Sequence, residues 1–177
     1  MALQAKPVVL PNSSEDPHII YDQDADKWRV LACAWGKGKT KGGFPATLYE
    51  SDHWDGPYDI IAGPVGVNST GCLLQKFGSE YYAVFGSKDR KVYICSYPDL
   101  KPTGELKMHL PPWDDESGTR IWPNVIALPE GYPSRYIALM MDRLNFLGMK
   151  GGNWTYGAMY LYHAHAPDSD QQAYEYE

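Results

Sequence analysis

The sequence offers two sets of side chains whose types could serve metal or thiol chemistry. His163 and His165 alternate, so a strand would place both imidazoles on one face, towards a metal. Without a third ligand nearby in the sequence, surface or core histidines are favoured, and we predict no metal and no other cofactor. Cys33, Cys72 and Cys95 lie far apart in separate apolar runs, so we interpret them as small buried core residues.

Acyl transfer and phosphate binding have little support in the sequence. The Gly-x-Ser-x-Gly motif of a serine nucleophile is absent. The basic stretch at residues 37–43 lacks the full glycine-rich spacing of a phosphate-binding loop, and no helix pattern follows it. We interpret this stretch as a solvated hairpin loop.

Composition and charge narrow the classes of partner. The net charge of -6 and the absence of clustered Lys and Arg argue against nucleic acid. No apolar run approaches the roughly 20 residues of a membrane span, so we expect no membrane partner. Residues 1–9 lack the apolar region of a signal peptide. A secreted or periplasmic location therefore requires a leader that has been removed, and otherwise we expect a cytoplasmic protein.

The elements that position any site are predicted to be short strands. Aromatic residues make up 14% of the chain, alongside 17 Gly and 14 Pro, which favours strands joined by tight turns. No segment shows sustained helical periodicity. With 177 residues, the chain is expected to form one domain of the all-β class.

Internal repetition refines this expectation. Three segments, at residues 14–62, 66–110 and 119–166, each run strand, turn, strand, loop, strand. A repeat of about 50 residues with three or four antiparallel strands is typical of a β-propeller blade, and a β-sandwich with similar hairpins is the alternative. Residues 1–13 are then an N-terminal extension or closing strand, and residues 167–177 form a polar tail.

Two short motifs resemble those of glycoside hydrolase family 43 and its relatives, which are five-bladed β-propellers. The run Asp-Pro-His-Ile-Ile-Tyr at residues 16–21 is similar to the opening of their blades. The Gly-Pro-Tyr loop at residues 51–58 is similar to their blade-edge loops. The resemblance implies an incomplete propeller of about three blades that acts on plant-type or related oligosaccharides.

The resemblance also implies an inverting hydrolysis by an Asp base and a Glu acid. In one register Asp16 matches the base of the first blade. In the other, Glu15 matches the acid of the third blade, and Asp16 stands where the family has Gly. The corresponding openings of the second and third repeats have Gly71 and Asn124, so neither supplies another acid.

Five further residues are candidates for substrate binding: His18, Trp122, Asn124, Asp142 and Arg143. An indole can stack on the apolar face of a sugar, although packing between blades is as good an interpretation of each tryptophan. The Asp-Arg pair ends the apolar run at residues 136–141, where it could bond to sugar hydroxyls or form an ion pair that caps the strand.

Three functions follow as hypotheses. The first is a family-43-like glycoside hydrolase that uses Glu15 and Asp16. The second is a non-catalytic carbohydrate-binding propeller module, because the set of carboxylates is incomplete. The third is an assembly module, in which open blade edges are covered by homo-oligomerisation or by a partner chain that completes the propeller.

Overall fold

The computed structural model describes residues 6–35, 44–87, 91–106, 124–141 and 159–164. Within these ranges the secondary structure consists of eleven antiparallel β-strands and contains no helix. The predicted all-β class is therefore confirmed. None of the described residues forms a helix with the length and apolar character that crossing a membrane requires.

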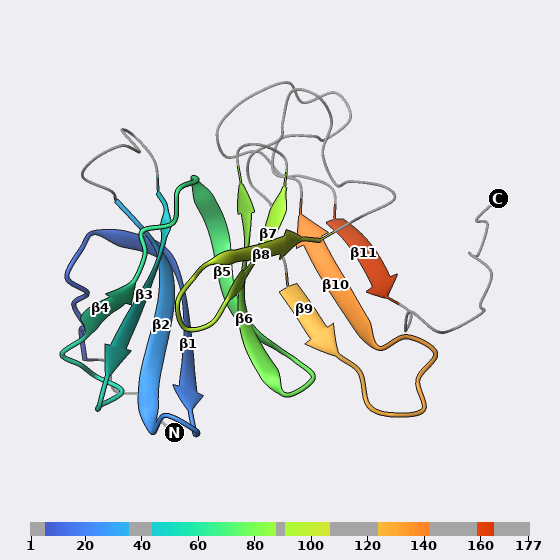
Figure 1. Cartoon of the computed structure of the whole chain (residues 1–177), viewed down its shortest axis with the longest axis horizontal. Helices are drawn as coiled ribbons and strands as arrows, with labels where there is room; N and C mark the ends of the chain where they lie inside the picture. The colour runs from blue at the N-terminus through green and yellow to red at the C-terminus, as the bar shows by residue number, and fades with distance from the viewer. Residues whose placement is uncertain (1–5, 36–43, 88–90, 107–123, 142–158, 165–177) are drawn as a thin grey trace.

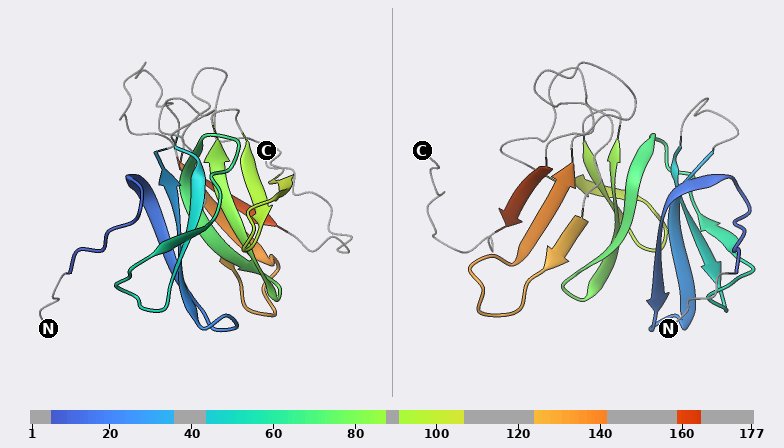
Figure 2. Two further views of the ribbon diagram at one scale, coloured as in Figure 1. Left: turned by 60° about the vertical axis from the view of Figure 1, so that its left-hand side comes forward. Right: turned by 180° about the vertical axis from the view of Figure 1, so that it is seen from behind.

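The strands form three sheets, and each sheet is a meander in which consecutive strands are hydrogen-bonded neighbours. The sheets follow one another along the molecule in chain order (Figures 1 and 2). The first contains β1 (Ser14–Asp22), β2 (Lys27–Ala34), β3 (Ala46–Ser51) and β4 (Asp59–Ala62). The second contains β5 (Ser69–Phe77), β6 (Glu80–Ser87), β7 (Val92–Ser96) and β8 (Pro102–Glu105). The third contains β9 (Asn124–Ala127), β10 (Tyr136–Met141) and β11 (Met159–Ala164).

Side chains and glycine close the first hairpin of each of the first two sheets. Between β1 and β2, the Asp22 Oδ1 atom accepts hydrogen bonds from the N–H groups of Asp24 and Ala25, which stabilises the turn. Between β5 and β6, Gly78 adopts a φ of 64°. Because it has no Cβ, glycine takes this left-handed conformation at little cost.

The apolar core lies between the sheets, and the second sheet is covered on both faces. Alternate residues of β6 point in opposite directions. Ala83 and Phe85 pack with residues of the first sheet, whereas Val84 packs against Val125 and Ala138 of the third. Burial on both faces explains why β6 reads as an almost continuous apolar run.

The first two sheets repeat a local irregularity at the same place. β1 has a bulge between Glu15 and His18, and β5 has one between Thr70 and Leu73. Within these bulges, Asp16 has a φ of 54° and Gly71 a φ of 60°. A bulge with one left-handed residue is a specific feature of backbone geometry. The similarity of the first two segments therefore extends from sequence pattern to backbone conformation.

Candidate functional site

The opening of β1 is attached to β5 by the carboxylate of Asp16. Its Oδ2 atom accepts a hydrogen bond from the N–H of Gly71 at 3.2 Å and lies 3.4 Å from the Thr70 hydroxyl, which donates to it. Asp is among the residues that tolerate a left-handed φ, so the residue type suits the bulge as well as the contact. This predicted catalytic residue thus has a structural role, since it joins the first two sheets.

His18 makes a second bond of the same kind. Its Nδ1 atom accepts the N–H of Leu74 at 3.2 Å, which places the proton of the neutral ring on Nε2. Burial lowers the pKa of His18 and favours this neutral form. Two side chains of β1 therefore bond to backbone N–H groups of β5, and His18 keeps one N–H donor.

Glu15 lies exposed at the second position of β1, opposite Cys33 in the register with β2. The pKa of the Cys72 thiol is raised, first by burial, then by its contact with Cys33, and further by the negative charges of Asp16 and Glu15. Both predicted catalytic carboxylates therefore lie near Cys72 of β5.

Asn124 is the first residue of β9, where it is exposed and lies opposite Leu139 of β10. β9 contacts β5, and β5 contacts β1, so the first strands of the three sheets are consecutive neighbours. The other three predicted substrate-binding residues, Trp122, Asp142 and Arg143, lie outside the described residues.

A hollow that the sequence did not reveal lies beside the opening of β1. It encloses about 390 Å³, a volume in the range of small-molecule sites. Trp35 is half exposed at its wall, where its ring meets Phe44 edge-on at 4.9 Å between centroids. The buried Thr47 hydroxyl has no hydrogen-bond partner in the described part of the chain. The lining consists of Pro11, Asn12, Ser13, Ala34, Trp35, Thr47, Ile60 and Pro64.

The hollow and the opening of β1 are connected through the backbone. The N–H of Trp35 donates to the Ser13 carbonyl at 2.8 Å, and Ser14 is paired with Ala34 in the β1–β2 register. Ser13 therefore lines the hollow two residues before Glu15. The indole of Trp35 and the hydroxyl of Ser13 can stack on, and hydrogen bond to, a polar ring compound. Glu15 is not part of this lining, because it is paired with Cys33, on the face of the first sheet that packs against β5.

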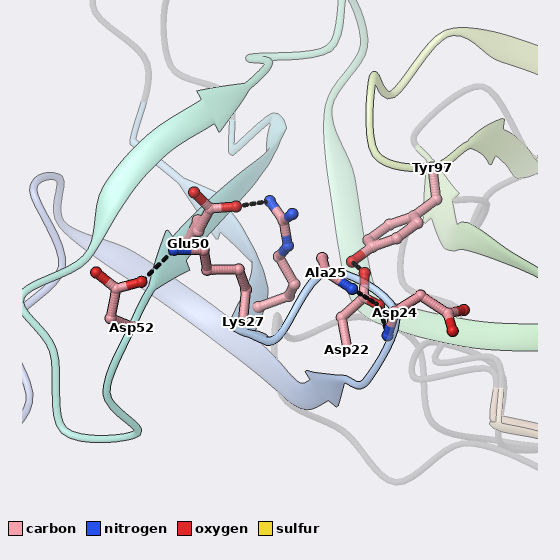
Figure 3. A network of polar contacts seen from close by, with 8 residues as sticks. Asp22, Asp24, Ala25, Lys27, Glu50, Asp52 and Tyr97 are labelled. Atoms are coloured by element: carbon pink, nitrogen blue, oxygen red, sulfur yellow. Dashed lines mark hydrogen bonds and ion pairs between the residues drawn. The ribbon is translucent and has the colours of Figure 1, made fainter.

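A polar network at the β1–β2 turn also joins the first two sheets (Figure 3). The Tyr97 hydroxyl donates to Asp22, and Arg29 pairs with Glu50 while its guanidinium lies 5.9 Å from the Tyr97 ring centroid. Burial acts to raise the pKa of Asp22. The bonds from Tyr97, Ala25 and Asp24, with the charge of Arg29, outweigh burial and lower it.

Sequence reasoning missed this network because its partners are distant along the chain, with Asp22 and Tyr97 separated by 75 positions. The one local signal was an Asp at a strand end followed by turn-forming residues. The network joins the first two sheets through a hydrogen bond and a cation–π contact and includes the Arg29–Glu50 ion pair.

The described residues contain no cluster of three or more His, Cys, Asp or Glu side chains that could hold a metal ion. His163 lies on β11 with its Nδ1 atom 3.4 Å from the Ser134 hydroxyl. Its predicted companion His165 lies outside the described residues. The cysteines are buried, as predicted.

The fold and these groups define an all-β protein of antiparallel meander sheets, with carboxylates and a hollow at the opening of its first strand. No protein-family model, curated protein or solved structure gives a significant match to the chain.

Proposed function

We propose that this chain is a carbohydrate-active protein built from propeller-type blades, similar to glycoside hydrolase family 43, that hydrolyses plant-type or related oligosaccharides. The succession of meander sheets supports this architecture, because propeller blades are four-stranded antiparallel sheets arranged around a common axis. The neighbouring first strands β1, β5 and β9 suit positions nearest that axis. The matching bulges of β1 and β5 support descent of the sheets from one repeat.

The observation that carries the chemical proposal is the pair of adjacent carboxylates at the opening of β1. The Asp16 carboxylate joins β1 to β5 through Gly71 and Thr70, and Glu15 is exposed to solvent, where a substrate can reach it. We therefore assign proton donation to Glu15 and a positioning role to Asp16. An inverting glycosidase needs its two carboxyl groups about 6.5–9.5 Å apart. In this proposal the base comes from outside the described residues or from a second chain.

Substrate binding is assigned to groups around the same opening. The Trp35 indole offers a stacking surface at the neighbouring hollow, and the exposed Asn12 and Ser13 of its lining offer hydrogen-bonding groups. The Nε2–H of His18 supplies a donor on the β5 side. The 390 Å³ of the hollow suits one or two sugar rings rather than a long chain.

Hydrolysis of aryl arabinosides, aryl xylosides, arabinan and xylan tests the proposal. Replacing Glu15 with Gln is expected to lower turnover at least about 100-fold, because a general acid contributes that much or more. Glu80→Gln is the matched control, since Glu80 is exposed at the start of β6 and is expected to leave turnover unchanged. Saccharide binding without any turnover would support the non-catalytic binding module instead.

A second candidate function, assembly, is favoured by the outer face of the third sheet. Leu139 and Leu161 lie opposite each other on β10 and β11, and they are 40% and 69% exposed. Ile126 of β9 shares this face and is 49% exposed. The opposite face, with Val125 and Ala138, is buried against the second sheet. Exposed apolar faces of this kind favour homo-oligomerisation or a partner chain.

Light scattering after size exclusion tests the assembly proposal. We expect a concentration-dependent oligomer for the wild type and a shift towards monomer for Leu161→Glu, because a charge in an apolar interface costs several kcal/mol. A wild type that stays monomeric at high concentration would contradict it.

A further inference from the structure

Two of the three cysteines meet across the boundary between the first two sheets. Cys33 is on β2 and Cys72 is on β5, and their Sγ atoms lie 2.9 Å apart in the core. Cys95, on β7 in the same core, makes no sulfur–sulfur contact in the part of the chain that the structure describes. Sequence spacing gave no sign of the pair, because 39 positions separate its members.

We propose that Cys33 and Cys72 form a disulfide when the chain folds in the presence of a low-molecular-weight disulfide such as oxidised glutathione. A disulfide needs about 2.0 Å between its sulfurs, so the two Sγ atoms have to approach each other by about 1 Å. A side-chain rotation supplies a movement of that size. The bond would link β2 to β5 one residue from Gly71, whose N–H binds Asp16.

The reaction is two successive thiol–disulfide exchanges. One cysteine loses its proton and attacks oxidised glutathione, which forms a mixed disulfide and releases the first glutathione thiolate. The second cysteine loses its proton and attacks the protein sulfur of the mixed disulfide, which forms the Cys33–Cys72 bond and releases the second glutathione. The protein loses two protons and two electrons, and one oxidised glutathione becomes two reduced molecules.

Burial decides when this exchange takes place. Both thiols are buried, and the pKa of Cys72 is raised by that burial, so little thiolate is present or accessible in the folded, reduced chain. Exchange is therefore expected during folding, while the sulfurs are open to solvent, and is slow afterwards. The bond closes a segment of about 40 residues, and such closure typically raises the folding equilibrium constant on the order of 100-fold.

The test is to refold the full chain with oxidised and reduced glutathione, or with dithiothreitol, and then to alkylate it with N-ethylmaleimide in denaturant. Intact mass counts the adducts. We expect one adduct on the oxidatively refolded wild type and three on the reduced chain. The Cys95→Ser variant should carry no adduct after oxidative refolding and two adducts when reduced. Its oxidised form should unfold at a higher urea concentration than its reduced form.

Cys33→Ser and Cys72→Ser are the matched variants that remove the pair. Each should give two adducts under both conditions and no difference in the urea midpoint. Three adducts on the oxidatively refolded wild type, two on Cys95→Ser, or a peptide map that pairs Cys95 would overturn the proposal. If a paired-cysteine variant fails to fold, the Cys95→Ser adduct count alone decides the matter.

Discussion

Asp16 combines a side-chain contact and an unusual backbone conformation, and mutations can separate the two. Its carboxylate bonds to β5, and its backbone adopts the left-handed conformation that Gly71 adopts in the next sheet. We expect Asp16→Ala to lower the free energy of unfolding by about 1–3 kcal/mol, because the bond is lost and alanine is strained at this φ. Urea unfolding followed by circular dichroism measures the change.

Two further substitutions separate these causes. Asp16→Gly removes the bond but relieves the backbone, so its cost should be smaller than that of alanine. Asp16→Asn keeps an acceptor oxygen and tolerates the left-handed φ, so it should cost least of the three. A loss for Asp16→Gly as large as that for Asp16→Ala would show that the φ angle does not matter for stability, and no loss for any of the three variants would show that the carboxylate contact does not matter either.

His18 gives the protein a pH dependence of stability with a defined sign. Its pKa in the folded state is lowered from the ordinary value of 6.5. Just below pH 6.5, the unfolded chain therefore binds a proton at His18 more readily than the folded chain does. The contribution of neutral His18 to the free energy of unfolding is fully present above about pH 6.5. It is lost as the pH falls from there through the folded-state pKa. The urea midpoint of the wild type should therefore drop between pH 7.5 and 5.5.

His18→Gln is the control for this effect, because glutamine offers an acceptor to the Leu74 N–H but does not titrate. Its midpoint should change less over the same pH interval. If the urea midpoints of the wild type and of His18→Gln fell equally with pH, the pH dependence would not come from His18.

At the residue scale, the sequence identified chemical types but not partners. Glu15 and Asp16 were singled out because the opening of β1 resembles the blade openings of glycoside hydrolase family 43. The roles of Asp16 and His18 depend on N–H groups 55 and 56 positions away, which no local pattern encodes. The same reason hid the contact of Cys33 with Cys72.

At the scale of elements, the chain leaves the first sheet after β4 at Gly63, whose backbone lies close to that of Ala46 on β3. Gly63 follows β4 with a φ of 92°, and a Cβ there would lie 2.8 Å from the Ala46 carbonyl oxygen. Gly63→Ala is expected to cost more than about 2 kcal/mol, because the left-handed backbone costs 1–2 kcal/mol and a backbone clash adds to it. Denaturant unfolding measures this loss.

Gly78→Ala is the matched control. Gly78 has a φ of 64° in the β5–β6 turn, but a Cβ there meets nothing within 4 Å. Its cost should be that of the φ angle alone, about 1–2 kcal/mol. A Gly63→Ala variant no less stable than Gly78→Ala would show that the approach of Ala46 is relieved at no cost.

Strands and turns could be predicted because their signals are local. Apolar runs bounded by Gly, Pro and Asp gave the all-β class, and similar segment patterns gave the expectation of successive strand units. Register and bulges could not be predicted, since each depends on a pairing partner. The turn after β1 illustrates this difference. Asp22 indicates a turn from the local sequence, but the hydrogen bond that it accepts from Tyr97 depends on the second sheet.

At the scale of the whole molecule, the second sheet connects the other two. Asp16 and His18 bond to β5, Tyr97 follows β7 and bonds to Asp22, and β6 packs on both sides. These contacts hold the opening of β1 against a fixed neighbour. An exposed Glu15 and the adjoining hollow are therefore presented from a rigid support, as a binding site requires.

We propose that the opening of β1 binds a carbohydrate, and titration with saccharides measures this binding. Isothermal titration of the full chain with arabino- and xylo-oligosaccharides is predicted to show saturable binding of at least one of them. Trp35→Ala should weaken that binding by about two- to tenfold, because a stacking aromatic contributes about 0.5–1.5 kcal/mol. A folded protein that binds no saccharide in the panel would contradict the account.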